Sequence, residues 1–122
     1  QAYRLDQAGL DHGALRCITS HALVRSQTPI LIDFSGASVE RRAANVTTLV
    51  QGLFISTRIS QLLRPLFPGA NKLDLIAYLR QYKQIPSLAS ICDLLAYLGL
   101  SDSRNTYCVG SAVGLPSNDQ PR

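Results

Sequence analysis

Methionine and tryptophan are absent from this sequence, and glutamate occurs once, at Glu40. A single glutamate leaves few carboxyl pairs for general acid–base catalysis. No stretch approaches the roughly 20 consecutive apolar residues of a membrane-spanning helix, and no signal-peptide pattern opens the chain. These absences argue against an enzyme and against a membrane protein. The chain begins at Gln1, so we expect a processed product or an excised fragment, and a removed leader is left open.

Cysteine is also scarce. The three cysteines, Cys17, Cys92 and Cys108, are too few and too widely spaced for the disulfide framework of a small secreted protein. An odd number of thiols is more typical of a reducing compartment. On this basis we predict an intracellular protein.

The length and composition suit one globular domain. With 122 residues the chain is long enough to bury a core, and its 46% of apolar residues excludes a disordered polymer. After Ser101 the sequence turns polar and glycine-rich, and its last residues have the composition of a loose tail. We therefore predict a single helical domain over residues 1–111 and a loose C-terminal tail over residues 112–122.

Apolar residues recur at helical spacing over residues 7–24, although Gly9 and Gly13 weaken this helix by about 1 kcal/mol each. The apolar segment at residues 30–34 is short and partly β-branched. Such a segment predicts a buried strand or an extended crossing segment. It is the clearest strand pattern in the sequence.

The longest helical pattern covers residues 39–66, with Ser38 as its N-cap, or Ser35 if the helix begins earlier. Its apolar face switches to the opposite side beside Gly52, the weakest helix former of the stretch. The alternatives are two helices separated at that point and one long helix covered first on one side and then on the other. We favour one helix that is bent or broken near Gly52.

Two further helices have clear end signals. Asn71 is a suitable N-cap for a helix over residues 72–82. Ser87 begins a helix over residues 88–98, and Gly99 stands where a C-terminal glycine belongs.

Together these patterns predict a mainly α fold, a compact domain of about four to five helices with at most one short strand or small sheet. The expected core residues are Leu49, Leu53, Ile59, Leu62, Leu79, Ile91 and Leu95.

Two groups of residues contain side chains that could bind a metal ion or catalyse a reaction. Cys17 and His21 share a helix face in the predicted helix, but a structural zinc ion needs four ligands and the other cysteines are distant. We predict neither a metal nor another cofactor. Asp33 follows an apolar run, as functional carboxylates do in α/β proteins, and an enzyme would combine it with a serine and a histidine. We favour helix capping by Asp33 or Ser35.

Basic residues concentrate in residues 41–83, where seven lysines and arginines face one acidic residue, Asp74, for a net charge of +6. Such a block is typical of a nucleic-acid or polyanion surface, and equally of solubilising side chains on outer helix faces. The predicted polyanion-binding residues are Arg41, Arg42, Arg58 and Arg64.

Residues 75–109 also resemble the opening of a helix-turn-helix, with residues 102–109 as its second helix. Gly110 and Gly114 would cut that second helix short, which weakens the pattern.

The function we favour is a non-enzymatic protein-interaction or assembly module, whose partner is a second copy of the chain or another protein. The face switch near Gly52 leaves an apolar strip for which the remaining helices provide little cover, and such a strip commonly marks a protein contact. The predicted contact residues are Phe54, Ile55, Ile59 and Leu63. The alternative function is nucleic-acid binding through the basic block or the helix-turn-helix.

Overall fold

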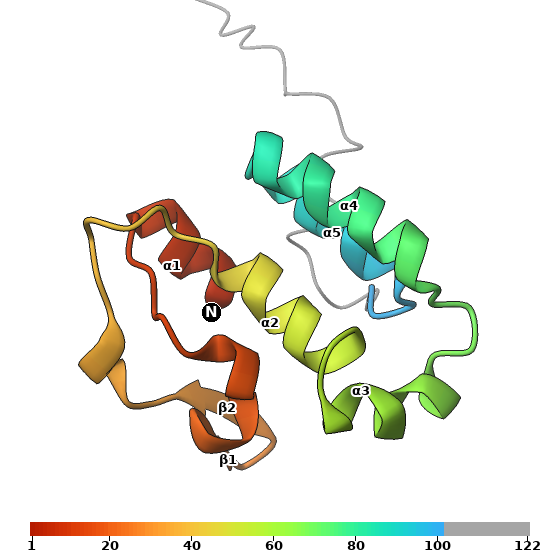
Figure 1. The fold of residues 1–122 in the computed structure, drawn as a ribbon, viewed down its shortest axis with the longest axis horizontal. Helices are drawn as coiled ribbons and strands as arrows, with labels where there is room; N and C mark the ends of the chain where they lie inside the picture. Colours follow the sequence, from red (N-terminus) through yellow and green to blue (C-terminus); the bar gives the residue numbers. More distant parts are fainter. Residues whose placement is uncertain (102–122) are drawn as a thin grey trace, which may run out of the picture.

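The computed structural model describes residues 1–101, and helices take up 57% of them, so the predicted mainly α fold is confirmed. Within these residues the chain forms five α-helices, three short 3-10 helices and one small antiparallel sheet (Figure 1). In chain order the elements are α1 (Ala2–Ala8), η1 (Leu15–Ser20), β1 (Ala22–Arg25), β2 (Thr28–Leu31), η2 (Phe34–Gly36), α2 (Asn45–Phe54), α3 (Arg58–Leu63), η3 (Arg64–Leu66), α4 (Lys72–Gln84) and α5 (Leu88–Tyr97). No helix in residues 1–101 is both long and apolar enough to cross a bilayer. The tail predicted at residues 112–122 lies outside the described residues.

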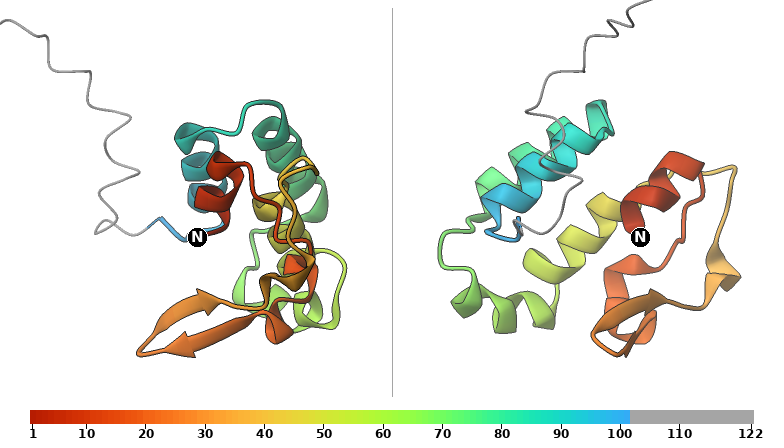
Figure 2. Two further views of the ribbon diagram at one scale, coloured as in Figure 1. Left: turned by 90° about the vertical axis from the view of Figure 1, so that its left-hand side faces the viewer. Right: turned by 180° about the vertical axis from the view of Figure 1, so that it is seen from behind.

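Helix α2 lies at the centre of the fold. It contacts α1, η1, α3 and α4, so segments far apart in the sequence meet on it (Figures 1 and 2). Helices α4 and α5 pack side by side, and the β1–β2 hairpin projects away from them (Figure 1). The buried apolar residues form one cluster that joins these elements: Ala2, Leu15, Val46, Val50, Leu75, Leu79, Tyr82, Leu94 and Leu98.

Sequence periodicity located this core only in part. Leu79 is buried, as predicted, and Leu49 and Ile91 pack half-buried against the core. Leu62 was predicted to be buried and is 74% exposed, so that assignment is wrong. Its helix, α3, is short, and residues on its outer side remain in solvent. The other predicted core residues are half-buried: Leu53, Ile59 and Leu95.

Helix α4 begins at Lys72 as predicted but ends two residues later than predicted, whereas α5 forms within the predicted limits. Residues at their own ends cap both helices. The Asn71 side chain accepts a hydrogen bond from the backbone N–H of Asp74 at 2.9 Å. Ser87 and Ser90 form a reciprocal capping box. At the end of α5, Gly99 takes a left-handed φ of +69°, and the next N–H donates to the carbonyl of Leu95 at 2.8 Å. This is the Schellman arrangement, in which glycine suits the left-handed position.

The helix predicted over residues 7–24 does not form, and that prediction is wrong. Helix α1 ends at Ala8 because Gly9 takes a left-handed φ of +72°. Gly13 takes a φ of +85°, and a Cβ there would lie 2.6 Å from the carbonyl oxygen of Gly36. The two glycines thus redirect the chain instead of weakening a continuous helix, and only glycine suits the second position.

Residues after η1 form a β-hairpin, in which Leu23 pairs with Ile30. The two-residue loop, Ser26 and Gln27, has φ values of +49° and +65°, as in a type I′ turn. The strand predicted at residues 30–34 forms only in part: β2 begins earlier, ends at Leu31 and is largely exposed, so the predicted bounds and the buried placement are wrong. Its partner strand was missed because the loop lacks the Asn-Gly or Asp-Gly pair that usually marks this turn.

The long pattern over residues 39–66 is divided between α2, α3 and η3. Helix α2 begins at Asn45 rather than at Ser38, because a carboxylate from α1, that of Asp6, caps its first N–H groups. The break follows Phe54 and does not occur at Gly52. The predicted interruption near Gly52 is therefore confirmed, whereas the predicted N-cap is wrong.

Gly52 has a different role from the one predicted. It is buried inside α2, and a Cβ at this position would lie 2.4 Å from the carbonyl oxygen of Arg16 in η1. The glycine allows the backbone of η1 to lie directly against the helix. This close approach positions η1 and, through it, the hairpin.

Candidate interaction surfaces

A buried polar network joins α1, α2 and α4. One carboxylate oxygen of Asp6 accepts hydrogen bonds from the backbone N–H and the side-chain Nδ2 of Asn45, both at 2.7 Å. The other accepts from the backbone N–H of Val46 at 3.2 Å and from the Tyr82 hydroxyl at 2.6 Å. Burial, and then the bond to Asp6, raises the pKa of Tyr82 well above 10.0.

Asn45 extends this network to the N-terminal loop. Its Nδ2 also donates to the carbonyl of Leu10 at 2.8 Å, and its Oδ1 accepts from the backbone N–H of His12 at 2.8 Å. Because these groups hydrogen-bond to one another, the network stabilises the fold and presents no group for binding a ligand.

His12, His21 and Asp33 come together near η2. The buried His12 ring donates from Nε2 to the carbonyl of Ile32 at 2.9 Å and packs on the ring of Phe34. His21 Nε2 lies 3.8 Å from Asp33 Oδ2. Among residues 1–101, no group of three or more His, Cys, Asp or Glu side chains is arranged to hold a metal ion.

The serine of this cluster is not arranged as a nucleophile. The Ser35 hydroxyl donates to Asp33 Oδ1 at 2.6 Å, whereas a nucleophilic serine needs a histidine beside its hydroxyl. The hydrogen bonds from Ser35 lower the pKa of Asp33, which makes its carboxylate a weaker base. Asp33 instead caps η2 through the backbone N–H of Ser35, which was the role we favoured from the sequence.

The four predicted polyanion-binding arginines separate into two pairs. Arg41 forms an ion pair with Asp11 at 2.9 Å and donates to the carbonyl of Gly36, so it ties two loops together. Arg42 donates to the carbonyl of Lys83 at the end of α4. Arg58 and Arg64 are exposed and make no hydrogen bond or ion pair with the described residues. Whether any of the four binds a polyanion stays a prediction.

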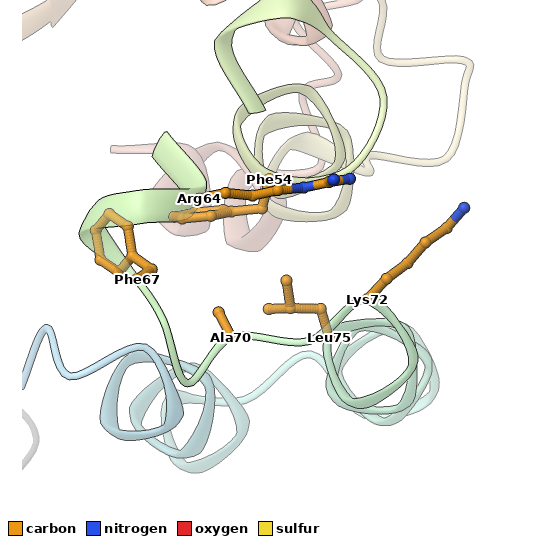
Figure 3. Close-up of a pocket in the computed structure, with 6 residues that line it drawn as sticks. All are labelled: Phe54, Arg64, Phe67, Ala70, Lys72 and Leu75. Atoms are coloured by element: carbon orange, nitrogen blue, oxygen red, sulfur yellow. The ribbon is translucent and has the colours of Figure 1, made fainter. Parts of the chain in front are cut away.

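Arg64 borders a pocket of about 310 Å³ between α2, η3 and α4 (Figure 3). Leu75 and Ala70 lie on one side of the pocket and Phe54 on the other. In the view of Figure 3, the charged ends of Arg64 and Lys72 lie at the end away from Phe67. Phe67 and Phe54 meet edge to face, with ring centroids 5.1 Å apart. The pocket therefore combines positive charge with aromatic surface.

The predicted contact residues, by contrast, do not form an exposed strip. Phe54 and Ile55 are half-buried against the core, and Ile59 and Leu63 are also half-buried. The chain folds back after α2, which half-buries these four residues, whereas Leu62 and Leu66 of the same pattern stay exposed. A contact through these four residues stays a prediction.

The hairpin also exposes large apolar side chains. Leu23 is 57% exposed, Val24 74% and Ile30 41%. Leu23 and Ile30 are directly paired across the strands, whereas Val24 points to the opposite face. The hairpin therefore presents apolar side chains on both faces, which a solvated two-stranded sheet seldom does.

The two outer edges of the hairpin differ. On the β2 edge, Pro29 has no N–H, and the Gln1 side chain donates to the Pro29 carbonyl and accepts from the Leu31 N–H. The backbone groups of Ala22 and Val24 point outward from β1 by the alternation of the ladder. They have no hydrogen-bond partner in residues 1–101. The sheet thus has one closed edge and one open edge.

The second helix of the predicted helix-turn-helix, residues 102–109, lies outside the described residues. The sequence signal missed for the hairpin was its apolar composition on both sides of Ser26 and Gln27. The basic residues of α4 were counted in the charged block, but they were not predicted as a site.

No family model, no curated protein and no solved structure matches this chain.

Proposed function

We propose that this chain is a non-enzymatic assembly module that associates with a second copy of itself through the β1 edge. The observation that carries the proposal is the hairpin with apolar side chains on both faces and one unpaired edge. Unpaired strand edges pair readily with another strand, and proteins normally protect them. Here β2 is protected by proline and Gln1, whereas β1 is not.

Two β1 strands would pair antiparallel about a two-fold axis and form a four-stranded sheet. The exposed Leu23 and Ile30 side chains of both copies would then lie on one continuous apolar face. A four-residue edge strand in a hairpin with three exposed large apolar side chains buries less than the roughly 1,200–2,000 Å² of a stable interface. We therefore expect a weak dimer, with a dissociation constant in the micromolar range or above.

Sedimentation equilibrium over a range of concentrations tests this proposal. The full chain should show a monomer–dimer equilibrium, and Leu23→Glu should shift it to monomer, because the charge would be placed in the apolar face. Leu73→Glu is the matched control, since Leu73 is 77% exposed on α4 and lies far from the hairpin in the sequence. A monomer at all concentrations, or equal loss of dimer in both variants, would contradict the proposal.

A further substitution distinguishes the hairpin from the contact predicted on α3. Ile59→Glu should leave the dimer intact if β1 provides the interface, provided that circular dichroism shows a folded chain. Loss of the dimer in Ile59→Glu alone would favour the α3 contact.

A further inference from the structure

Two adjoining pockets lie between α2 and α4. The first, about 310 Å³, contains Phe54, Arg64 and Lys72 (Figure 3). The second, about 290 Å³, is lined by Thr47, Gln51, Ile76, Leu79, Arg80 and Lys83. Figure 1 shows α2 and α4 running in opposite directions. Phe54 and Leu75 line the first pocket, and Gln51 and Ile76, which lie next to them along the same two helices, line the second. We therefore treat the pockets as consecutive parts of one depression, the α2–α4 groove.

The basic residues of α4 face this groove together. Lys72, Arg80 and Lys83 fall within an arc of roughly 80° on the helix, at 100° per residue. Their backbone positions span roughly 16 Å along the axis. Arg64 stands beside Lys72 at one end, and Arg42 reaches the carbonyl of Lys83 at the other. The cations thus form a line and not an isolated pair.

No acidic residue lines either pocket of the groove. Asp74, the one acidic residue among residues 41–83, lies on the opposite side of α4. Its carboxylate accepts hydrogen bonds from Asn71 at 2.9 Å and from the Tyr97 hydroxyl at 3.2 Å. The positive charge of the groove is therefore not neutralised by the described residues that line it.

We propose that the α2–α4 groove binds single-stranded nucleic acid. A line of cations suits a phosphate backbone, and Thr47 and Gln51 on the α2 side can donate uncharged hydrogen bonds to it. At the η3 end of the groove, beyond the charged ends of Arg64 and Lys72, the ring of Phe67 offers a surface on which a base can stack. Stacking on Phe67 requires an unpaired base, which a duplex does not present.

This site is independent of the assembly proposal, because no residue of the hairpin lines it. An acidic polypeptide would also meet the charge requirement, but it would make no use of the aromatic end. Replacing Phe67 should therefore weaken the binding of single-stranded nucleic acid but not the binding of an acidic polypeptide.

Fluorescence anisotropy with a labelled oligothymidylate of roughly 12 nucleotides, a typical length for such a site, provides the test. The full chain is titrated at several salt concentrations between about 50 and 200 mM. The groove variant is Arg80→Gln with Lys83→Gln. The matched control is Arg4→Gln with Arg58→Gln, which lowers the net charge equally at exposed positions that line neither pocket of the groove. Circular dichroism establishes that each variant is folded.

The groove variant should bind about tenfold more weakly or worse, and its log–log salt slope should fall by about 1.4 for two lost phosphate contacts. The control should retain most of the affinity. Phe67→Leu, which keeps an apolar side chain, should weaken binding about fivefold or more without changing the salt slope.

Equal losses in the groove and control variants would reduce the effect to net charge and overturn the proposal. Tighter binding of a duplex than of the single strand would also overturn it. Equal affinity for polyglutamate, with no effect of Phe67→Leu, would assign the groove to acidic polypeptides instead.

Discussion

The helical pair α4–α5 and the N-terminal region, residues 1–44, are ordered by different kinds of interaction. Helices α4 and α5 begin and end at their own capping residues, Asn71, Ser87 and Gly99. The N-terminal region contains short helices and loops, held by contacts between residues 20 or more positions apart. Capping interactions between residues close in the sequence therefore order α4 and α5, whereas long-range polar bonds order residues 1–44.

The largest expected effect is the loss of the long-range network. Replacing Asp6 by Ala would leave the Tyr82 hydroxyl and several N–H groups of α2 without their acceptor. We expect a loss of about 3 kcal/mol in the free energy of unfolding, because hydrogen bonds to charged groups contribute about 1.5–3 kcal/mol each. Urea denaturation measures this change.

Asp93→Ala is the matched control, because Asp93 is exposed on α5 and makes no hydrogen bond with the described residues. Hydrogen exchange should show faster opening of α1 and of the start of α2 in Asp6→Ala. A loss no larger than in the control would mean that the N-terminal region does not depend on this network.

The next effect concerns the contact between α2 and η1. In an isolated helix, Gly52→Ala would stabilise by about 1 kcal/mol. Here the new Cβ would meet the carbonyl oxygen of Arg16 at 2.4 Å, so we expect a net destabilisation of about 2 kcal/mol. Thermal denaturation followed by circular dichroism measures it. Gly69→Ala should be nearly neutral, since no atom lies within 4 Å of its added Cβ; a stabilised Gly52→Ala variant would refute the close approach.

The smallest effect belongs to the locally ordered half. Ser87→Ala removes the capping box of α5 and should cost about 1 kcal/mol. The faster hydrogen exchange should stay within the first turns of α5. Ser101→Ala, at an exposed position outside the helices, should change nothing measurable. Accelerated exchange in α1 or the hairpin would show that the two halves are less independent than the structure indicates.

The candidate sites, like the fold, were predictable from the sequence only in part. The excess of positive charge in residues 41–83 was evident from the sequence, but its arrangement was not. Folding directs Arg41 toward Asp11 and gathers Arg64, Lys72 and Arg80 along one groove. The hairpin could not be expected from residues that also satisfied a helical period, since their pairing depends on a turn without the usual sequence signal.

The sequence by itself determined the helical class, the starts of α4 and α5, and the presence of a basic block. These features depend on side chains that interact within about four residues of one another, so neighbouring residues in the sequence are enough to predict them. Only the tertiary structure decided that α2 begins at Asn45 and that Gly52 serves a close approach and not a break. A carboxylate from α1 and a carbonyl from η1 impose these choices. Both groups lie more than 30 residues away in the sequence and act only once the chain has folded.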